Sequence, residues 1–187
     1  MRFIQAFLAL ALVFASAHAL ADETIKLGSP ITSENIADVF EMQRIASVLG
    51  DGFDREDWDA IITFFADEVS TTSGAAVKGV PEIKTKEQIV TRWESLYSSV
   101  DELIVHHFTS NERVFFHDKD NASMFSKGVI VGLTTPGGDK ATTGGTLKTF
   151  RWIDYEYGFT RTEDGWKVNK LLVDYIVDEA VSLAASQ

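Results

Sequence analysis

Apolar and polar residues follow a helical spacing in the first half of the chain and a strand spacing in the second. From about Ser33 the apolar positions fall on one helical stripe, which predicts a helix that ends at Gly50 and Gly52. A second helix is predicted to begin at Asp54, a good capping residue, with Asp57 three residues further on. Apolar residues at three-to-four spacing continue after this cap and support the second helix.

A third helix is predicted from Thr85, whose capping-box partner is Gln88. After residue 101 the spacing becomes that of β-strands and stays so almost to the end of the chain. The predicted strands are 102–116, 122–133, 145–161 and 166–176, with a short additional strand near Val69 to Thr72. In each long run apolar residues occur at both odd and even positions, and so on both faces of the strand. This indicates a curved sheet that is covered on both faces.

The first residues have the layout of a secretory signal. One positive charge, Arg2, precedes a short apolar run that ends in small residues, and a cut after Ala21 or Ala19 fits this layout. We therefore interpret residues 1–21 as a signal peptide, 22–34 as a lead-in, 35–178 as one domain and 179–187 as a tail. The apolar run is too short for a good spanning helix, so we expect a secreted or periplasmic protein that is free of the membrane after cleavage.

The charge of the chain argues against nucleic acid as a partner. Lys and Arg number 17 and Asp and Glu number 28, giving a formal net charge of −11, and no segment clusters the basic residues that phosphate backbones require. The same charge disfavours adsorption to anionic membranes. Because the chain contains no cysteine, disulfides and thiolate metal sites are excluded and the apolar core must supply the stability.

Three segments, in the expected order, resemble motifs of the SnoaL-like, nuclear transport factor 2-like superfamily. Gly52 to Ile61 is similar to its second-helix motif, Val105 to Asn111 to the strand after its third helix, and Asp164 to Val168 to its final hairpin. The resemblance implies an α+β fold with three N-terminal helices packed on a strongly curved, mixed or antiparallel sheet. Such a sheet forms a cone with one pocket. It does not imply one reaction, because members include polyketide cyclases, dehydratases, an isomerase and binding modules.

His107 is the candidate general base. The resemblance implies this role, because His107 matches the strand position of the histidine that scytalone dehydratase-like and hexachlorocyclohexane dehydrochlorinase-like members use as a base. A neutral imidazole titrates near physiological pH and can abstract a proton next to a leaving group or a carbonyl. The neighbouring His106 is expected to face the other side of the strand, since side chains alternate.

The carboxylate partner of this base is the point at which the sequence departs from those relatives. They place an aspartate on the first helix, and the matching position here is Val48. The nearest acid, Asp51, lies three residues on, nearly one helical turn away, and is the candidate partner. Asp54 and Asp57 are interpreted as helix caps.

The strand around residues 150–157 supplies the candidates for binding a ligand. Alternation puts Arg151, Ile153, Tyr155 and Tyr157 on one face, and Trp152, Asp154 and Glu156 on the other. Tyr155 and Tyr157 are candidates to orient a polar ligand, with sheet core or dimer surface as the other interpretation. Which face is concave does not follow from the sequence.

Trp58 and Trp93 lie at helical spacing with other apolar residues. They are interpreted either as part of the helical core or as lining the pocket. Neither a metal nor a cofactor is predicted. The histidines form no spaced pair on one helical face, and the glycine pairs lie in turns between strands, without the strand-to-helix context of a phosphate site. The chain's four histidines are His18, His106, His107 and His117.

Two functions stay open, and the sequence does not decide whether the chain is an enzyme. The first is a cofactor-independent lyase, isomerase or cyclase acting on a small, largely apolar carbonyl or hydroxyl compound, with His107 as the acid/base and Tyr155, Tyr157 or Asp51 assisting. The second is a non-catalytic module that binds a small hydrophobic molecule or dimerises through its sheet. The resemblance also implies a homodimer.

Overall fold

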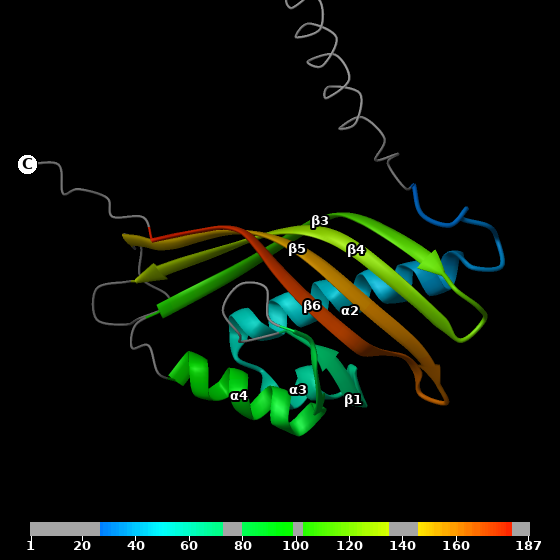
Figure 1. Ribbon diagram of the computed structural model, residues 1–187, viewed down its shortest axis with the longest axis horizontal. Coiled ribbons are helices and arrows are strands. Elements are labelled where there is room, and N and C mark those ends of the chain that lie inside the picture. Colours follow the sequence, from blue (N-terminus) through cyan, green and yellow to red (C-terminus); the bar gives the residue numbers. More distant parts are fainter. Residues whose placement is uncertain (1–26, 73–79, 99–102, 135–145, 181–187) are drawn as a thin grey trace, which may run out of the picture.

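The computed structural model describes residues 27–72, 80–98, 103–134 and 146–180 (Figure 1). The predicted signal peptide lies outside these residues. The helices are α2 (Ile36–Arg55), α3 (Trp58–Ile62) and α4 (Lys86–Ser98). The strands are β1 (Phe65–Thr71), β2 (Glu82–Thr85), β3 (Leu103–Phe116), β4 (Asn121–Thr134), β5 (Thr146–Thr162) and β6 (Gly165–Ala180). Within the described ranges, no helix has both the length and the apolar character needed to cross a membrane.

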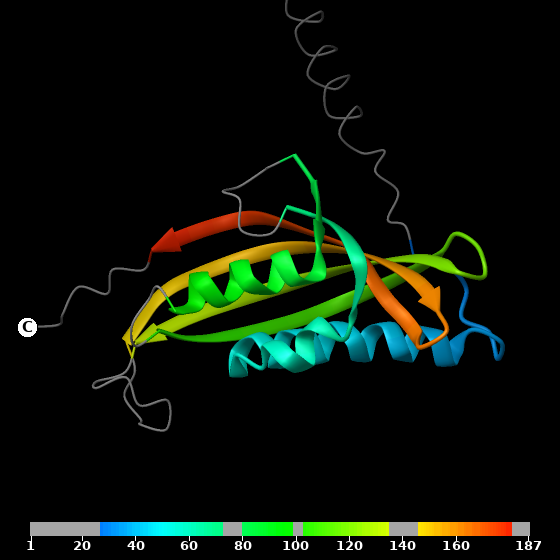
Figure 2. The same ribbon diagram turned by 90° about the horizontal axis from the view of Figure 1, so that it is seen from below.

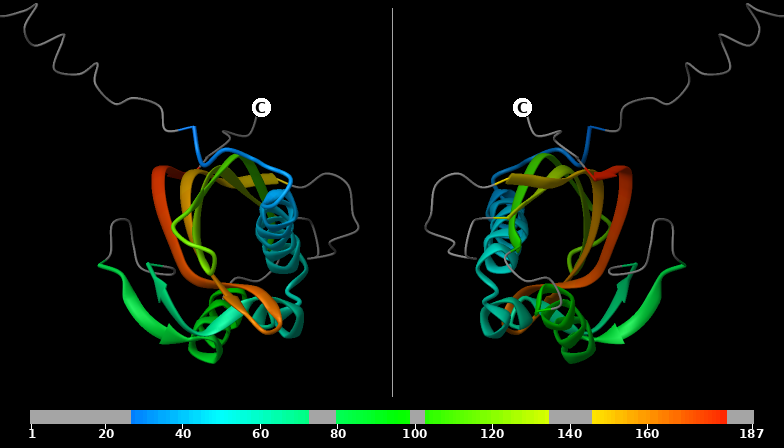
Figure 3. Two further views of the ribbon diagram at one scale, coloured as in Figure 1. Left: turned by 90° about the vertical axis from the view of Figure 1, so that its right-hand side faces the viewer. Right: turned by 90° about the vertical axis from the view of Figure 1, so that its left-hand side faces the viewer.

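The six strands form one mixed sheet in the order β2-β1-β6-β5-β4-β3. Neighbouring strands are antiparallel except β1 and β6, which are parallel. The long strands bend strongly, so that one face of the sheet is concave and turned towards the helices (Figures 2 and 3). In the end-on views α2 runs beside β3, while α3 and α4 lie below the strands. The predicted α+β class and curved sheet are confirmed.

The two N-terminal helices differ from the prediction in their ends. Helix α2 continues through Gly50 and Gly52 to Arg55, and α3 is a single short helix. Gly52 is buried, and a Cβ at this position would lie 2.7 Å from Cγ1 of Ile61. The glycine therefore lets α3 pack closely on α2, and it does not end the helix.

The helix caps are partly as predicted. Asp57 caps α3, since its Oδ1 accepts from the backbone N–H of Ala60 at 3.1 Å. Asp54 is not a cap, because it lies inside α2. The capping box of α4 is confirmed: Thr85 N–H donates to Gln88 Oε1 at 3.0 Å, and Gln88 N–H donates to Thr85 Oγ1 at 3.3 Å.

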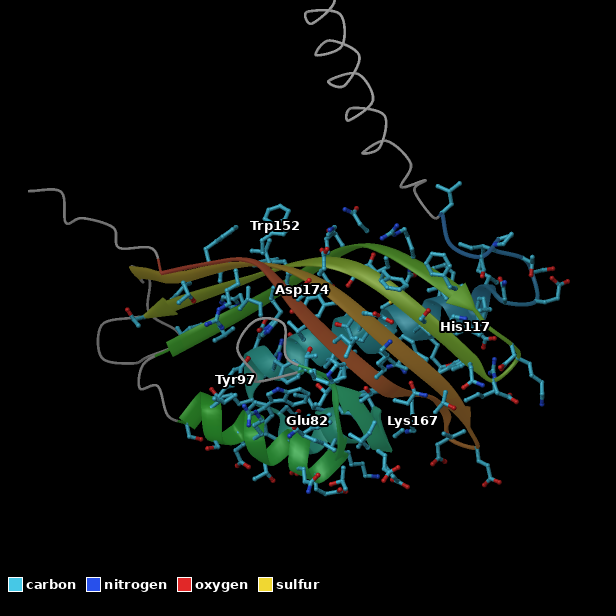
Figure 4. The ribbon with its side chains drawn as sticks, viewed as in Figure 1. Glu82, Tyr97, His117, Trp152, Lys167 and Asp174 are labelled. Carbon is cyan, nitrogen blue, oxygen red and sulfur yellow. The ribbon has the colours of Figure 1, made fainter. Side chains whose placement is uncertain are left out.

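The core lies between the helices and the concave face of the sheet. Its largest fully buried side chains are Trp166, Phe159, Met42, Ile45, Leu49, Ile61, Met124, Ile153, Val69 and Val168. On β5 the buried side is that of Ile153, Tyr155 and Tyr157, whereas Trp152 is 44% exposed and projects from the outer face (Figure 4). The concave face is therefore the one that carries the two tyrosines.

Asp38, near the start of α2, forms hydrogen bonds with residues of the β5–β6 hairpin. Its carboxylate accepts from Arg161 Nη2 at 2.5 Å and from Trp166 Nε1 at 3.0 Å, and the Arg161 guanidinium lies 4.3 Å from the centre of the Trp166 ring. Partial burial raises the pKa of Asp38, but the hydrogen bonds from Arg161 and Trp166 outweigh it, so the pKa lies below its ordinary value. This contact holds the helix against the sheet.

Candidate active site

His107 on β3 and Asp54 on α2 form a hydrogen-bonded pair. His107 Nδ1 lies 2.6 Å from Asp54 Oδ1, and the two side chains are 11% and 15% exposed. The backbone N–H of His107 also donates to both carboxylate oxygens, at 3.1 Å to Oδ1 and 3.0 Å to Oδ2. Because a carboxylate only accepts, Nδ1 carries the imidazole proton, and the lone pair of the neutral ring is on Nε2.

The sheet topology explains why Asp54 can reach this backbone group. Strand β3 is an edge strand, so alternate N–H groups along it have no neighbouring strand to receive them. Asp54 supplies the acceptor for the N–H of His107. Gly50, one turn earlier, also lies against β3, since an added Cβ would be in ordinary contact with Cβ of His107 at 3.5 Å. The helix and the strand therefore come together at the pair.

The predicted partner Asp51 does not reach His107. Its side chain is 62% exposed and forms an ion pair with Arg55 Nε at 2.8 Å on the surface of α2. The prediction was wrong because it ended the helix at Gly50 and took Asp54 for a cap. A signal was present: Asp54 follows Gly50 by four residues, so a helix that continues puts the carboxylate on the same stripe as the small residue.

His106 lies on the opposite side of β3, as predicted, and its side chain is 50% exposed. Its Nδ1 is nevertheless 3.7 Å from Asp54 Oδ2. Because the carboxylate is at the open edge of the sheet, it is approached from both faces. Only His107 lies within hydrogen-bond distance of it.

An aromatic cluster borders the imidazole of His107. The ring of Phe53 lies 5.6 Å from it, and Trp93 meets Phe53 edge-on at 4.6 Å. Trp58 packs on Phe53 at 6.1 Å and on Tyr97 at 5.3 Å. Both predicted tryptophans thus belong to the packed helical side, with Phe53, which the sequence interpretation missed, next to the base. These apolar rings strengthen the electrostatic interaction of the pair by excluding water.

The tyrosines of β5 form a ladder on the concave face. The rings of Tyr155 and Tyr157 lie 5.8 Å apart with 32° between their planes, and Tyr157 and Phe159 lie 6.1 Å apart with 22°. The Tyr155 ring takes up the space beside Gly128, where an added Cβ would lie 2.4 Å from its Cε2. The three rings therefore follow one another along the concave side of β5.

The pairing of β3 and β4 indicates that the Tyr155 ring is directed towards His107. Gly128 pairs with Thr109 on β3, two residues from His107. A ring that crosses β4 at Gly128 is directed towards this part of β3. Tyr155 is thus the predicted ligand-binding residue on the His107 side of the ladder, and Tyr157 lies further along.

Tyr157 is protonated at any ordinary pH. Burial raises the pKa of its phenol well above the ordinary 10.0, and the negative charge of Glu112 raises it further. The phenol can therefore donate a hydrogen bond. In the described part of the chain, no group of three or more His, Cys, Asp or Glu side chains is arranged to hold a metal ion.

A separate groove of about 660 Å³ lies near the β3–β4 hairpin and does not include His107. Small residues such as Ser123 and Gly158 line it, together with Phe115 and Phe125. His117, labelled in Figure 4, also lines it and lies 3.0 Å from Ser123 Oγ through Nε2. This groove is thus distinct from the His107 site.

Solved structures of several proteins share this fold. The Kfla4162 protein from Kribbella flavida is 14% identical with a TM-score of 0.64, covering 76% of this chain and 93% of its own. A hexachlorocyclohexane dehydrochlorinase (LinA) type 2 is 15% identical with a TM-score of 0.63, covering 82% and 95%. A protein from Catenulispora acidiphila, solved in complex with S-DNPA, is 12% identical with a TM-score of 0.58, covering 74% and 93%.

The comparison with curated proteins gave no match. The family described as the SnoaL-like domain matches residues 34–171, a span that contains α2 to α4, β1 to β5 and the first part of β6. Because this match covers well over half of the sequence, the chain belongs to the SnoaL-like domain family.

Proposed function

We propose that this protein is a cofactor-independent lyase or isomerase that removes a proton from carbon in a small, largely apolar carbonyl or hydroxyl compound. The observation that carries the proposal is the 2.6 Å contact between Asp54 Oδ1 and His107 Nδ1. It leaves Nε2 as a base, and in the described part of the chain no hydrogen bond occupies that atom. Base, orienting carboxylate and apolar surroundings are the parts that proton abstraction requires.

The proposed step is an elimination. Nε2 of His107 takes a proton from a carbon atom, and the electron pair of that C–H bond becomes the new double bond. The leaving group on the next carbon departs with the electrons of its own bond and takes up the proton from the imidazolium, so that hydroxide leaves as water. Asp54 stabilises the imidazolium and stays ionised. In an isomerisation the same proton returns to another carbon.

One of the similar structures supports this class of chemistry, and another supports a small-molecule ligand. One is named a dehydrochlorinase, which denotes an elimination, and another holds a small molecule. Tyr155 is in position to hold a polar group of the substrate, since its ring crosses β4 towards the His107 segment. We assign it the role of orienting a carbonyl or hydroxyl oxygen.

The test is turnover of a panel of β-hydroxy and β-halo ketones in D₂O, followed by NMR for elimination and for deuterium at the α-carbon. We expect His107→Gln to lower the rate by about 10³-fold, because glutamine cannot accept the proton. His106→Gln is the matched control and should keep wild-type activity. Equal activity of the two variants would exclude His107 as the base.

A non-catalytic binding module is the second candidate, and one observation favours it. Ser126 on the concave face is buried and its hydroxyl has no hydrogen-bond partner within the described ranges, which suits a bound molecule whether or not it reacts. Mass spectrometry of compounds that copurify with the protein separates the candidates. A tightly held compound that the protein leaves unchanged, together with no turnover of the panel, would favour the binding module.

We extend the proposal to location and assembly. The layout of residues 1–21 supports export, and the mass of the mature protein tests it. The exposed Phe108 and Trp152 on the outer face of the sheet support a homodimer that covers this face. Light scattering of the wild type and of Trp152→Lys tests the dimer, which the lysine should weaken.

A further inference from the structure

A second group of polar side chains lies on the concave face, away from His107. It consists of Ser126 on β4, Tyr157 on β5 and Glu112 on β3. Ser126 and Tyr157 are each 4% exposed, and Glu112 is half-buried. Within the described residues, none of the three has a hydrogen bond or ion pair. Buried polar groups normally have partners, so this group lacks something that a ligand can supply.

The pairing of β4 and β5 makes Tyr157 a diagonal neighbour of Ser126. Tyr155 pairs with Ser126, yet its ring stands over Gly128, two positions further along β4. The Tyr157 ring lies 5.8 Å from that of Tyr155, with 32° between the two planes. Since Tyr157 pairs with Met124, two positions further is Ser126. The register therefore makes Tyr157 and Ser126 diagonal neighbours on the concave face.

A bulge in β3 places Glu112 opposite Ser126. The register of β3 and β4 shifts between Ser110 and Arg113, so Asn111 and Glu112 together face Ser126. Asn111 has a φ of 60°, the left-handed conformation that such an irregularity uses. Burial raises the pKa of the Tyr157 phenol, and the negative charge of Glu112 raises it further, which agrees with a carboxylate in the neighbourhood of the phenol. The register thus puts Glu112, Ser126 and Tyr157 at neighbouring positions of β3, β4 and β5.

We propose that Glu112, Tyr157 and Ser126 form a subsite that binds the ammonium group of a ligand. A half-buried carboxylate that has no counter-ion in the described part of the chain favours a donor that is also a cation. The stacked rings of Tyr155, Tyr157 and Phe159 favour a cation further, and so does the net charge of −11. An alcohol would satisfy the hydrogen bonds and leave the charge uncompensated.

The proposal rests on the proposed function only in taking the concave face as the ligand side, and it deepens that function by naming a substrate feature. His107 pairs with Ile130, which lies four positions along β4 from Ser126. This separation is roughly 13 Å at the rise of a β-strand. The ammonium group is therefore remote from the carbon that loses its proton, and it serves for recognition and is not the leaving group.

The experiment compares 2-phenylethylamine with its neutral analogue 2-phenylethanol by titration calorimetry on the full chain. We expect the amine to bind roughly tenfold more tightly than the alcohol, and Glu112→Gln to remove this advantage without changing the affinity for the alcohol. Glu163→Gln, which neutralises an exposed turn residue, is the matched control and should change neither affinity. Equal binding of amine and alcohol to the wild type would overturn the proposal.

NMR provides a second measurement that does not depend on the variants. In the wild type, the amine should shift the backbone amides of residues 112, 126 and 157, and shifts scattered over the acidic surface would overturn the proposal. His107→Gln should leave amine binding intact. Loss of turnover in His107→Gln with intact amine binding therefore tests the base alone. A wild-type protein that turns over its substrate but binds amine and alcohol equally refutes the subsite alone.

Discussion

The two faces of the same sheet differ in how many of their polar side chains have partners within the protein. On the outer face, Asp154 Oδ2 accepts from Lys127 at 2.7 Å and Glu156 accepts from Lys170 at 2.6 Å. On the concave face, Tyr157 and Ser126 are buried without hydrogen bonds among the described residues. The outer-face carboxylates thus pair with lysines, whereas on the concave face only part of the polar groups are paired: His107 bonds to Asp54, but the Ser126 hydroxyl and the Tyr157 phenol have no partner among the described residues. The difference assigns structure to one face and recognition to the other.

The largest effect expected on the concave face is that of Asp54→Asn. The amide can still accept from the backbone of His107, but it favours the wrong imidazole tautomer, so turnover should fall by about 10²- to 10⁴-fold. The rate on the best substrate of the ketone panel measures it. Asp51→Asn is the control and should leave turnover unchanged, because Asp51 is 62% exposed and pairs with Arg55 on the surface of α2. A silent Asp54→Asn would contradict the assigned pair.

Gly128→Ala tests how tightly the tyrosine ladder is packed. An added Cβ would lie 2.4 Å from Tyr155 Cε2 and 3.3 Å from the backbone oxygen of Phe108. We expect the free energy of unfolding to fall by about 1–3 kcal/mol in urea denaturation. Adding Tyr155→Val should recover part of the loss, because the ring that clashes is gone. No recovery would show that the backbone contact is the cause.

Acid titration tests the contact that holds α2 against the sheet. Because the pKa of Asp38 is lower in the folded protein than its ordinary 3.8, its contribution to stability is present above that pH and is lost as the pH falls through the folded pKa. Asp38→Asn should therefore lower the free energy of unfolding by about 1 kcal/mol at pH 7 and by less at pH 3. An equal loss at both pH values would exclude an ionic contribution.

The smallest effect is expected on the outer face, at Lys127 and Asp154. Both side chains are 42% exposed, and their Nζ and Oδ1 atoms lie 2.5 Å apart. A double-mutant cycle with Lys127→Met and Asp154→Asn should give a coupling of about 0.2–1 kcal/mol, because water and salt screen such pairs. Neither change should affect turnover. A coupling well above this range would contradict the expectation that this exposed pair on the outer face contributes little.

The elements that local chemistry specifies were predictable. The capping box of Thr85 and Gln88 is present, and the four long strands lie near their predicted residues because their apolar residues can be buried only in an extended, paired chain. Strand β2 was not predicted, since four residues that are mostly exposed carry too weak a pattern. The histidine was found through its motif, but its carboxylate was not.

By itself, the sequence determined the α+β class, the strand order along the chain and the strand position of His107. It did so because spacing and caps act between residues that are close in sequence. Only the tertiary structure decided that α2 runs through Gly52, that Asp54 is the partner of His107, and that the tyrosine side of β5 is concave. Each of these depends on a surface brought up from elsewhere in the chain: Ile61 against the glycine, the open edge of β3 against the carboxylate, and the helices against the sheet.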